Sequence, residues 1–595
     1  MENFPTDDSL ETSTYDYIVV GSGPGGGSVA ANLAEAGFSV LVLEAGPPSG
    51  NEVYRDVPIF FAQATEDPEV AWEYWVQHND GGKAAHGDMW VDEKDGVLYP
   101  RASALGGCAI HNSGIIMYPA HSDWDDIMEL TGDNGWHHEA MWQHWQKVLE
   151  WQAVSSKNPF APLESPRTDP GSLITSLEGP NWFLKSMGDA ERSGELNDKD
   201  NVGTAGPWNL QIGIKAGVRQ GVRDRLISAE RNCPMLEIQC DALVEKILFE
   251  PGQTAPRAVG VQFLNGRHLY EASPKYQETT EEERAALRQV VRARREVIIA
   301  GGTYNSPQIL MLSGIGPADH LRAHGIEVLV DSPCVGTNLQ DRREISVIDR
   351  YPLPELAENP YVGALIKSLS PTGPRLSVCL SGWRADPENS QLGQFGIPCI
   401  TYRTEGADGS ATNCVTIGVP IQFRAHHPGW VKEAFAHVGQ SWTWLTLMGY
   451  TGDRNGYVRL RSGDPTRCPD INFRAFGNGA GGEKDLAALT QAIEMCRELN
   501  RVEPGEGEIF PGPDVQDLGD FIRKEHYGHH AACSNPLGRT IDDSVVDSSF
   551  KVHGVEGLRI VDASVFPKMP GLFLIAAVQT LSQKASIDIL RDAGD

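Results

Sequence analysis

The fold of this chain is decided by the stretch YDYIVVGSGPGGG, residues 15–27. Its first half is a short apolar run typical of a buried strand, and the residues after it, 28–36, are typical of a helix. The turn between them carries Gly21, Gly23 and Gly26 in the spacing G-x-G-x-x-G. This spacing lets backbone amides approach a pyrophosphate at the N-terminus of a helix. The pattern therefore predicts a phosphate-binding turn rather than a merely flexible glycine loop.

A second apolar run, VLVLEAG at residues 40–46, contains an acid. Glu44 lies twenty-three residues after Gly21, where a dinucleotide-binding fold places the carboxylate that accepts a hydrogen bond from an adenosine ribose. Strand, turn, helix, strand and acid follow one another in the expected order. The chain is therefore predicted to bind FAD or NAD through Gly21, Gly23, Pro24, Gly26, Glu44 and Ala45.

Composition excludes several other classes of function. The chain has 595 residues, too many for one compact core, so two or three lobes are expected. It has 80 acidic and 50 basic residues, and its formal net charge of −30 repels phosphate backbones and anionic lipids. Neither a nucleic acid nor a membrane surface is therefore expected as a partner.

The N-terminus and the cysteines give no sign of targeting or of metal binding. Residues 1–14 are polar and acidic, unlike a secretory signal, and no apolar stretch reaches the ~20 residues needed to span a bilayer. We therefore expect a soluble protein of the cytoplasm. The ten cysteines include no C-x-x-C pair, which argues against a zinc site or a dithiol redox centre, so no metal is predicted.

Strand-like segments that belong with the N-terminal unit recur far along the chain. Short β-branched runs occur at residues 236–239, 243–248, 258–263, 296–302 and 558–563. Residues 346–519 instead contain more alternating runs, which suit a sheet with one covered face. We therefore expect an α/β protein in which a second lobe is inserted into a discontinuous dinucleotide-binding unit.

Four further segments resemble signatures of the glucose-methanol-choline (GMC) oxidoreductases. They are GTYNSPQILMLSGIG at residues 302–316, LGGCAIHN at 105–112, VGTNLQD at 335–341 and VHGVEGLRIVDASVFP at 552–567. The similarity extends from residue 15 to about residue 590. One departure follows the third segment, where Arg342 stands at the position of the family's customary histidine.

The resemblance implies two domains that meet over a flavin ring. One is a Rossmann-like FAD-binding domain, expected to comprise residues 15–150, 225–345 and 520–595. The other is a substrate-binding domain with a large, mostly antiparallel sheet covered by helices, expected at residues 151–224 and 346–519. Further contacts to FAD are implied at Gly107, His111, Asn112, Val244, Gly302, Asp562, Ala563 and Phe573.

Members of this family oxidise a small-molecule alcohol to a carbonyl compound by hydride transfer to N5 of the flavin, and pass the electrons to O₂ or another acceptor. This chemistry needs a base near neutral pKa within ~3 Å of the hydroxyl, and histidine suits that role best. The family's pattern, aligned on HYGHHAACSNPLG at residues 526–538, implies that the base is His530. Adjacent side chains of an extended segment point to opposite sides, so His529 and His530 are not expected both to face the flavin. His529 or His526 would then support the base.

The second polar side chain of the family, a histidine or an asparagine, is missing here. Its position, forty-three residues after His530, holds Phe573, which cannot make that hydrogen bond. Either another side chain takes this role or the reaction does not need it. An apolar wall favours a bulky or aromatic alcohol over a small polyol. It also keeps open a redox-neutral lyase that retains FAD structurally, as hydroxynitrile lyases of this family do.

The loop around His111 resembles the version found in choline oxidase, where the histidine at this place is bonded to the 8-methyl carbon of the flavin. Such a bond would prevent FAD from dissociating, and a histidine stacked beside the flavin without a bond is the alternative. A plain NAD-dependent dehydrogenase is disfavoured, because residues 302–316 and the pair Asp562-Ala563 would have no role. The natural substrate, the electron acceptor and the formation of a homo-oligomer are left open.

Overall fold

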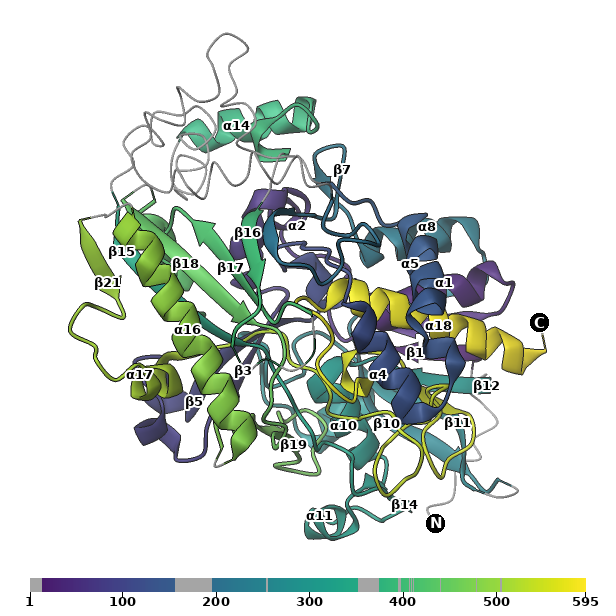
Figure 1. Ribbon diagram of the computed structural model, residues 1–595. Helices are drawn as coiled ribbons and strands as arrows, with labels where there is room; N and C mark the ends of the chain where they lie inside the picture. The colour runs from purple at the N-terminus through teal and green to yellow at the C-terminus, as the bar shows by residue number, and fades with distance from the viewer. Residues whose placement is uncertain are drawn as a thin grey trace.

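The computed structural model describes residues 13–155, 195–252, 255–351, 374–393 and 397–594, apart from residues 406, 408, 410, 439, 478 and 503–505. Residues 156–194, which are predicted to belong to the substrate-binding domain, lie outside the described residues. Within the described part, two large sheets with helices packed on them form the two ends of the molecule (Figure 1).

The first sheet is built around the N-terminal strand. Its strand order is β10-β11-β12-β1-β2-β9, with β22 beside β12. The pairs from β12 through β1 and β2 to β9 are parallel, as is the pair of β12 and β22, whereas β10, β11 and β12 pair antiparallel. These strands are β1 (Thr14–Val20), β2 (Val40–Leu43), β9 (Leu236–Gln239), β10 (Ala242–Glu250), β11 (Arg257–Asn265), β12 (Arg288–Ile299) and β22 (Leu558–Ile560).

Strand β12 is longer than the sequence predicts. The charge-dense residues 279–295, which end where the apolar run of residues 296–302 begins, predict a solvated, partly helical excursion. Its helix, α9, covers only Glu281–Leu287, and the charged residues 288–295 extend the strand. Pairing with β11 accounts for the extension, because ladder hydrogen bonds do not require apolar side chains.

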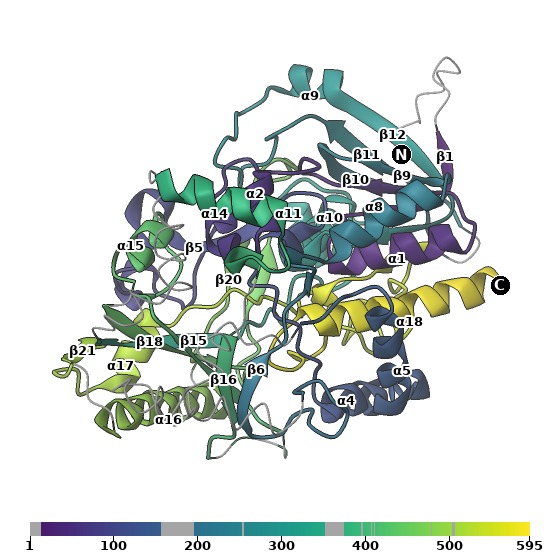
Figure 2. The same ribbon diagram turned by 90° about the horizontal axis from the view of Figure 1, so that it is seen from above.

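Helix α1 (Pro24–Glu35) begins at the glycine turn and lies between α8 (Val222–Asn232) and α18 (Ile575–Ala593) (Figure 2). Half of its twelve residues are glycine or alanine, and most of the helix is buried. These small side chains let the two neighbouring helices approach its backbone closely. The close packing joins the two ends of the chain beside the parallel strands and confirms the predicted Rossmann-like unit.

The second sheet is antiparallel throughout, in the order β21-β15-β18-β17-β16-β6. Its strands are β6 (Gly206–Leu210), β15 (Arg343–Arg350), β16 (Ile397–Tyr402), β17 (Cys414–Val419), β18 (Ser441–Met448) and β21 (Gly507–Phe510). The long helix α16 (Ala480–Val502) runs along one face (Figure 1). The predicted fold class is confirmed. The exact domain boundaries stay predictions, and β15 begins two residues before the end of the predicted FAD-binding segment.

Shorter elements complete the described part. They are the strands β3 (Ala71–Val76), β4 (Trp90–Val91), β5 (Gly96–Ala102), β7 (Ile214–Lys215), β8 (Val218–Arg219), β13 (Ile315–Gly316), β14 (Val330–Asp331), β19 (Tyr457–Arg459) and β20 (Asp470–Asn472), and the helices α2 (Glu52–Asp56), α3 (Phe61–Thr65), α4 (His121–Thr131), α5 (His138–Leu149), α10 (Gly302–Leu312), α11 (Ala318–Ala323), α14 (Pro374–Ala385), α15 (Trp430–Ala436) and α17 (Leu518–Glu525). None of the helices in the described ranges is long and apolar enough to cross a membrane.

Candidate active site

The glycine turn at the end of β1 is packed too tightly for any side chain. Gly21 has φ +101°, and a Cβ there would lie 2.3 Å from the carbonyl oxygen of Ala300. A Cβ at Gly25 would lie 2.1 Å from the carbonyl oxygen of Val561. The turn therefore needs glycine because three chain segments, the ends of β1, β12 and β22, cross at this point.

A cavity of about 200 Å³ opens at this turn. Its lining includes the predicted residues Gly21, Gly23, Pro24, Glu44, Ala45, Gly107, Val244, Gly302, Asp562 and Ala563. Gly26 lies behind the turn, where a Cβ would lie 2.2 Å from the carbonyl oxygen of Gly21. The first amides of α1 have no partners within the helix and point toward its N-terminal end, as a pyrophosphate site requires.

Two buried carboxylates stand at the cavity. Glu44 accepts hydrogen bonds from Ser22 N, Ser22 Oγ and Gly46 N, and burial raises the pKa of its carboxyl group. A carboxylate offers about four lone-pair positions, so Glu44 can still accept from a ribose hydroxyl. Asp562 accepts from Gly302 N, Ser306 Oγ and Ser564 N. It therefore ties the start of α10 to the segment that follows β22.

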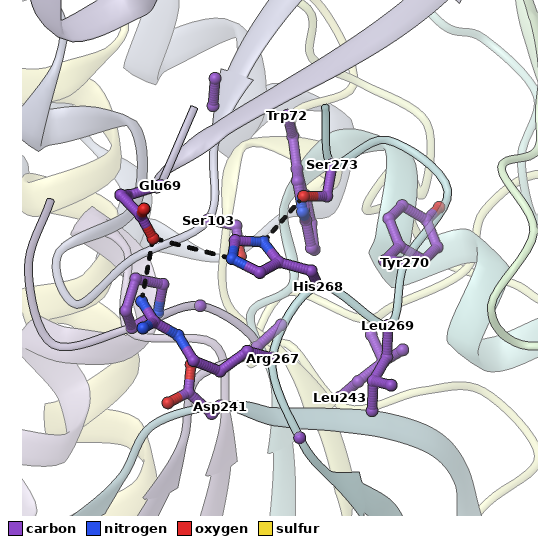
Figure 3. Close-up of a pocket in the computed structure, with 15 residues that line it drawn as sticks. Glu69, Trp72, Ser103, Asp241, Leu243, Arg267, His268, Leu269, Tyr270 and Ser273 are labelled. Carbon is purple, nitrogen blue, oxygen red and sulfur yellow. Dashed lines mark hydrogen bonds and ion pairs between the residues drawn. The ribbon is translucent and has the colours of Figure 1, made fainter. Parts of the chain in front are cut away.

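A small pocket of about 20 Å³ adjoins the cavity beyond Ala45, and Figure 3 shows the side chains around it. Trp72, Leu243 and Tyr270 line both spaces. At the pocket's edge, Glu69 Oε2 lies 3.4 Å from Arg267 Nη2 and 3.7 Å from His268 Nε2 (Figure 3). Sequence patterns gave no signal for this group, because its members come from segments about 200 residues apart.

A second cavity, of about 310 Å³, lies against the second sheet, whose strands β15, β16, β17 and β18 contribute to its lining. His111, Asn112, His529, His530 and Phe573 all line this cavity. It meets the first cavity where four residues line both spaces, namely Arg101, Cys108, Leu574 and Ile575. The remaining wall is mostly apolar and comes largely from the inserted lobe, with Ile397, Ile417, Val419, Ile421, Phe423, Trp430, Phe435, Leu445 and Leu447.

The two adjacent histidines share one carboxylate. His530 Nδ1 lies 3.2 Å from Glu344 Oε1 with hydrogen-bond geometry, and His529 Nδ1 lies 3.1 Å from the same oxygen in an ion-pair contact. The centroids of the two imidazole rings are 4.0 Å apart. Glu344, at the start of β15, has no exposed side-chain surface. One buried anion therefore holds both rings at the cavity wall.

The prediction that His529 and His530 would not both face the site is wrong. The alternation rule holds for a regular strand, but residues 528–530 are outside any strand. His530 N donates to Asp341 Oδ1 at 2.9 Å and Ala531 N donates to Tyr99 Oη at 2.8 Å, so side chains rather than a strand partner hold this backbone. Because no strand geometry constrains these residues, the rings of His529 and His530 both line the second cavity.

Electrostatics keep His530 neutral and Glu344 charged. Burial lowers the pKa of His530 to about 3, and the charge of His529 contributes to this shift, whereas Glu344 opposes it. This pKa lies well below the near-neutral value that the sequence leads us to expect for the base. Burial alone would raise the pKa of Glu344, but His529 and His530 lower it to about 2. With Nδ1 of His530 facing an anion, that nitrogen carries the proton, and Nε2 is left as an acceptor.

His526 is not part of this cavity. Its ring is buried against Phe476 and His78, with centroid separations of 4.7 and 5.0 Å, and Nδ1 contacts the carbonyl oxygen of Ile522 at 3.0 Å. His526 therefore contributes to the packing of the segment that precedes the two cavity histidines in the sequence. Two other residues, Glu344 and His426, line the cavity without having been predicted. Glu344 follows the VGTNLQD segment by three residues, which is the one sequence signal that pointed to it.

Arg342, at the place of the family's customary histidine, has a structural partner. Its buried guanidinium donates from Nη2 to the carbonyl oxygens of Pro570 and Gly571. These residues directly precede the loop that carries Phe573 to the cavity wall. The substitution therefore anchors that loop, and Arg342 itself does not line the cavity.

Comparison with known proteins identifies this arrangement. Family models described as GMC oxidoreductase match residues 15–344 and 452–582. The chain is a GMC oxidoreductase. An oxygen-dependent choline dehydrogenase of Pseudomonas fluorescens (strain SBW25) is 29% identical to it over 583 residues, which cover 93% of this chain and 89% of the relative.

Solved structures share the fold of this GMC oxidoreductase. A formate oxidase has a TM-score of 0.76 at 21% identity and covers 99% of this chain and 100% of its own. A fungal aryl-alcohol oxidase has a TM-score of 0.66 at 19% identity, with 98% and 100% covered. The resemblance found in the sequence is thereby confirmed.

As a GMC oxidoreductase, the enzyme binds FAD. The first cavity fits this cofactor, because it joins an amide-rich helix end, a buried carboxylate for a ribose and a passage to the second cavity lined by Arg101, Cys108, Leu574 and Ile575. The assignment of individual contacts remains a prediction.

Proposed function

We propose that this enzyme oxidises a bulky or aromatic alcohol to the corresponding carbonyl compound, with His530 as the base. The observation that carries the proposal is the 3.2 Å contact between His530 Nδ1 and the buried carboxylate of Glu344, in a cavity that meets the cofactor cavity. Bound FAD would supply the hydride acceptor, held by the glycine turn, Glu44, Gly302 and Asp562.

His530 performs the proton step in this account. Its Nε2 accepts the hydroxyl proton while the hydride leaves the carbinol carbon, so the ring ends as an imidazolium and the alcohol as a carbonyl. The anionic Glu344 stabilises the positive charge that develops on the ring. The apolar wall excludes water, which strengthens this electrostatic support.

The lining of the second cavity supports a bulky substrate without a positive charge. Aromatic and branched side chains of the inserted lobe, such as Phe423, Trp430 and Leu445, surround a volume of about 310 Å³. Among the described lining residues, Glu344 is the one carboxylate, and both histidines already engage it. A quaternary ammonium alcohol such as choline would lack a counter-ion there, so the aryl-alcohol oxidase is the better guide to substrate class than the choline dehydrogenase.

Anaerobic titration of the purified holoenzyme tests this proposal. Aliphatic, aromatic and amino alcohols are added in turn while flavin absorbance is followed, and the organic product is identified. We expect bleaching with aromatic or bulky alcohols, together with formation of the carbonyl compound. The redox-neutral lyase alternative predicts conversion without bleaching. Reoxidation of the bleached enzyme with O₂ or an artificial dye then distinguishes an oxidase from a dehydrogenase.

A further inference from the structure

We propose that His529 is a second catalytic residue, which donates a hydrogen bond from Nε2 to the substrate oxygen, and that Glu344 is the positioning residue for both imidazoles. The inference deepens the proposed alcohol oxidation and rests on it. It also identifies the side chain that takes the role for which Phe573 has no polar atom.

The reaction needs a donor as well as a base. When His530 takes the hydroxyl proton, negative charge grows on the substrate oxygen before the carbonyl bond is complete, and a fixed donor at that oxygen lowers the barrier. The ring of Phe573 occupies one side of the base, with its centroid 5.6 Å from the His530 ring. A phenyl ring offers no such hydrogen bond.

The ring of His529 lies on another side of the base, and its centroid is 4.0 Å from that of His530. About one third of its side chain is exposed, which leaves an edge available to a substrate in the cavity. His426 lies next to His529, with its ring centroid 5.0 Å away. His529 is thus the histidine that stands next to the base.

The contacts of the two imidazoles with Glu344 divide their roles. Glu344 is a fully buried carboxylate, and its Oε1 lies 3.1 Å from His529 Nδ1 and 3.2 Å from His530 Nδ1. Each imidazole therefore turns Nδ1 to the carboxylate and leaves Nε2 for the substrate. In the proposal, His530 Nε2 accepts the hydroxyl proton, and His529 acts in the imidazolium form, which carries a hydrogen on both nitrogens and so can donate from Nε2.

The protons and electrons balance when the two histidines have these roles. The hydroxyl proton moves to His530 Nε2, and the electron pair of the broken O–H bond completes the carbonyl. The carbinol carbon loses a hydride, for which bound FAD would supply the acceptor. His529 keeps both of its protons throughout. Its contribution is a hydrogen bond that strengthens as the oxygen becomes negative.

Two variants of equal length test the donor. His529→Gln keeps an N–H near the position of Nε2, whereas His529→Met has similar bulk and no donor. The rate of anaerobic flavin reduction by the alcohol is measured for the wild-type holoenzyme and both variants, after treatment with EDTA. The chelator matters because Glu344, His529 and His530 offer ligand atoms within 4.8 Å of one another and could hold a metal ion.

We expect His529→Met to reduce flavin ~10²–10³-fold more slowly than the wild type, the usual loss of one oxyanion donor, and His529→Gln to retain at least ~10-fold more activity than His529→Met. Adding Phe573→Asn to His529→Met should restore part of the rate, because the new amide stands beside His530. The same substitution should not rescue His530→Ala. FAD content and melting temperature confirm that each variant is folded.

The inference is overturned if His529→Met reduces flavin at the wild-type rate, or if the Gln and Met variants lose equal activity and Phe573→Asn restores none. Either result leaves the proposed function standing, since the wild type still bleaches with alcohol. A wild type that bleaches with no alcohol overturns the proposed function and this inference together.

Discussion

The carboxylate of Glu344 contacts the imidazole of His530, with 3.2 Å between Oε1 and Nδ1, and it does so from β15 of the antiparallel sheet. His530 itself lies in the C-terminal segment, 186 residues further along the chain. The proposed base is therefore assembled only when the two parts of the chain pack together. This relationship fixes which nitrogen of His530 is available to the substrate.

Replacing Glu344 by glutamine should lower the rate of flavin reduction by at least ~10²-fold, because the amide cannot stabilise the imidazolium formed on His530. The FAD content should be unchanged, since Glu344 does not line the cofactor cavity. Stopped-flow absorbance gives both quantities. Glu35→Gln, which removes a surface partner of Arg225, is the control and should react like the wild type.

The pH dependence of turnover should lack the acid limb that an ordinary histidine gives near pH 6.5. A base works when unprotonated, above its pKa, and burial lowers the pKa of His530 to about 3. Turnover on saturating alcohol should therefore stay constant as the pH falls through 6.5 and decline only well below it. A decline centred near 6.5 would show that His530 is not held neutral as described.

His111 is expected to bind FAD covalently. Its ring is buried, and Nδ1 has no hydrogen-bond partner within the described part of the chain. It lines the second cavity three residues after Cys108, which lines both cavities. After acid precipitation, the wild-type pellet should remain yellow and the His111→Ala pellet should be colourless. Equal release of flavin from both proteins would contradict a covalent bond between His111 and FAD.

Gly25→Ala should abolish FAD binding or prevent folding. The added Cβ would lie 2.1 Å from the carbonyl oxygen of Val561, a backbone atom that cannot move aside. Gly382→Ala, at an exposed position of α14 with nothing within 4 Å of the new Cβ, is the matched control. The ratio of flavin to protein absorbance and the melting temperature should change only in the first variant. Stoichiometric FAD in Gly25→Ala would contradict the described crossing of chains.

Much of the architecture could be predicted because short sequence motifs indicate it. The glycine turn, Glu44 and the segment after β22 each carry their own spacing, and the structure brings them to one cavity. The extent of β12 could not be predicted in the same way. Its charged first half becomes a strand because β11 lies beside it, and local composition does not report that neighbour.

Local sequence patterns also could not predict which side chain contacts the proposed base, or how the ring of His529 is oriented. Glu344 and His530 are far apart in sequence, and no periodicity links them. The orientation of His529 depends on hydrogen bonds that the backbone amides of the next two residues donate to Asp341 and Tyr99, which replace a strand partner. The sequence showed at Phe573 that a polar group was missing, and the packing supports the proposal that His529 stands in its place.

The central claim is most directly tested by comparing the wild-type enzyme with His530→Ala in a single anaerobic turnover. Each holoenzyme is mixed with an alcohol that bleaches the wild type, and the rate of loss of flavin absorbance is recorded. The account predicts that His530→Ala keeps its FAD and is reduced ~10²–10⁴-fold more slowly. Reduction of His530→Ala at the wild-type rate would contradict it.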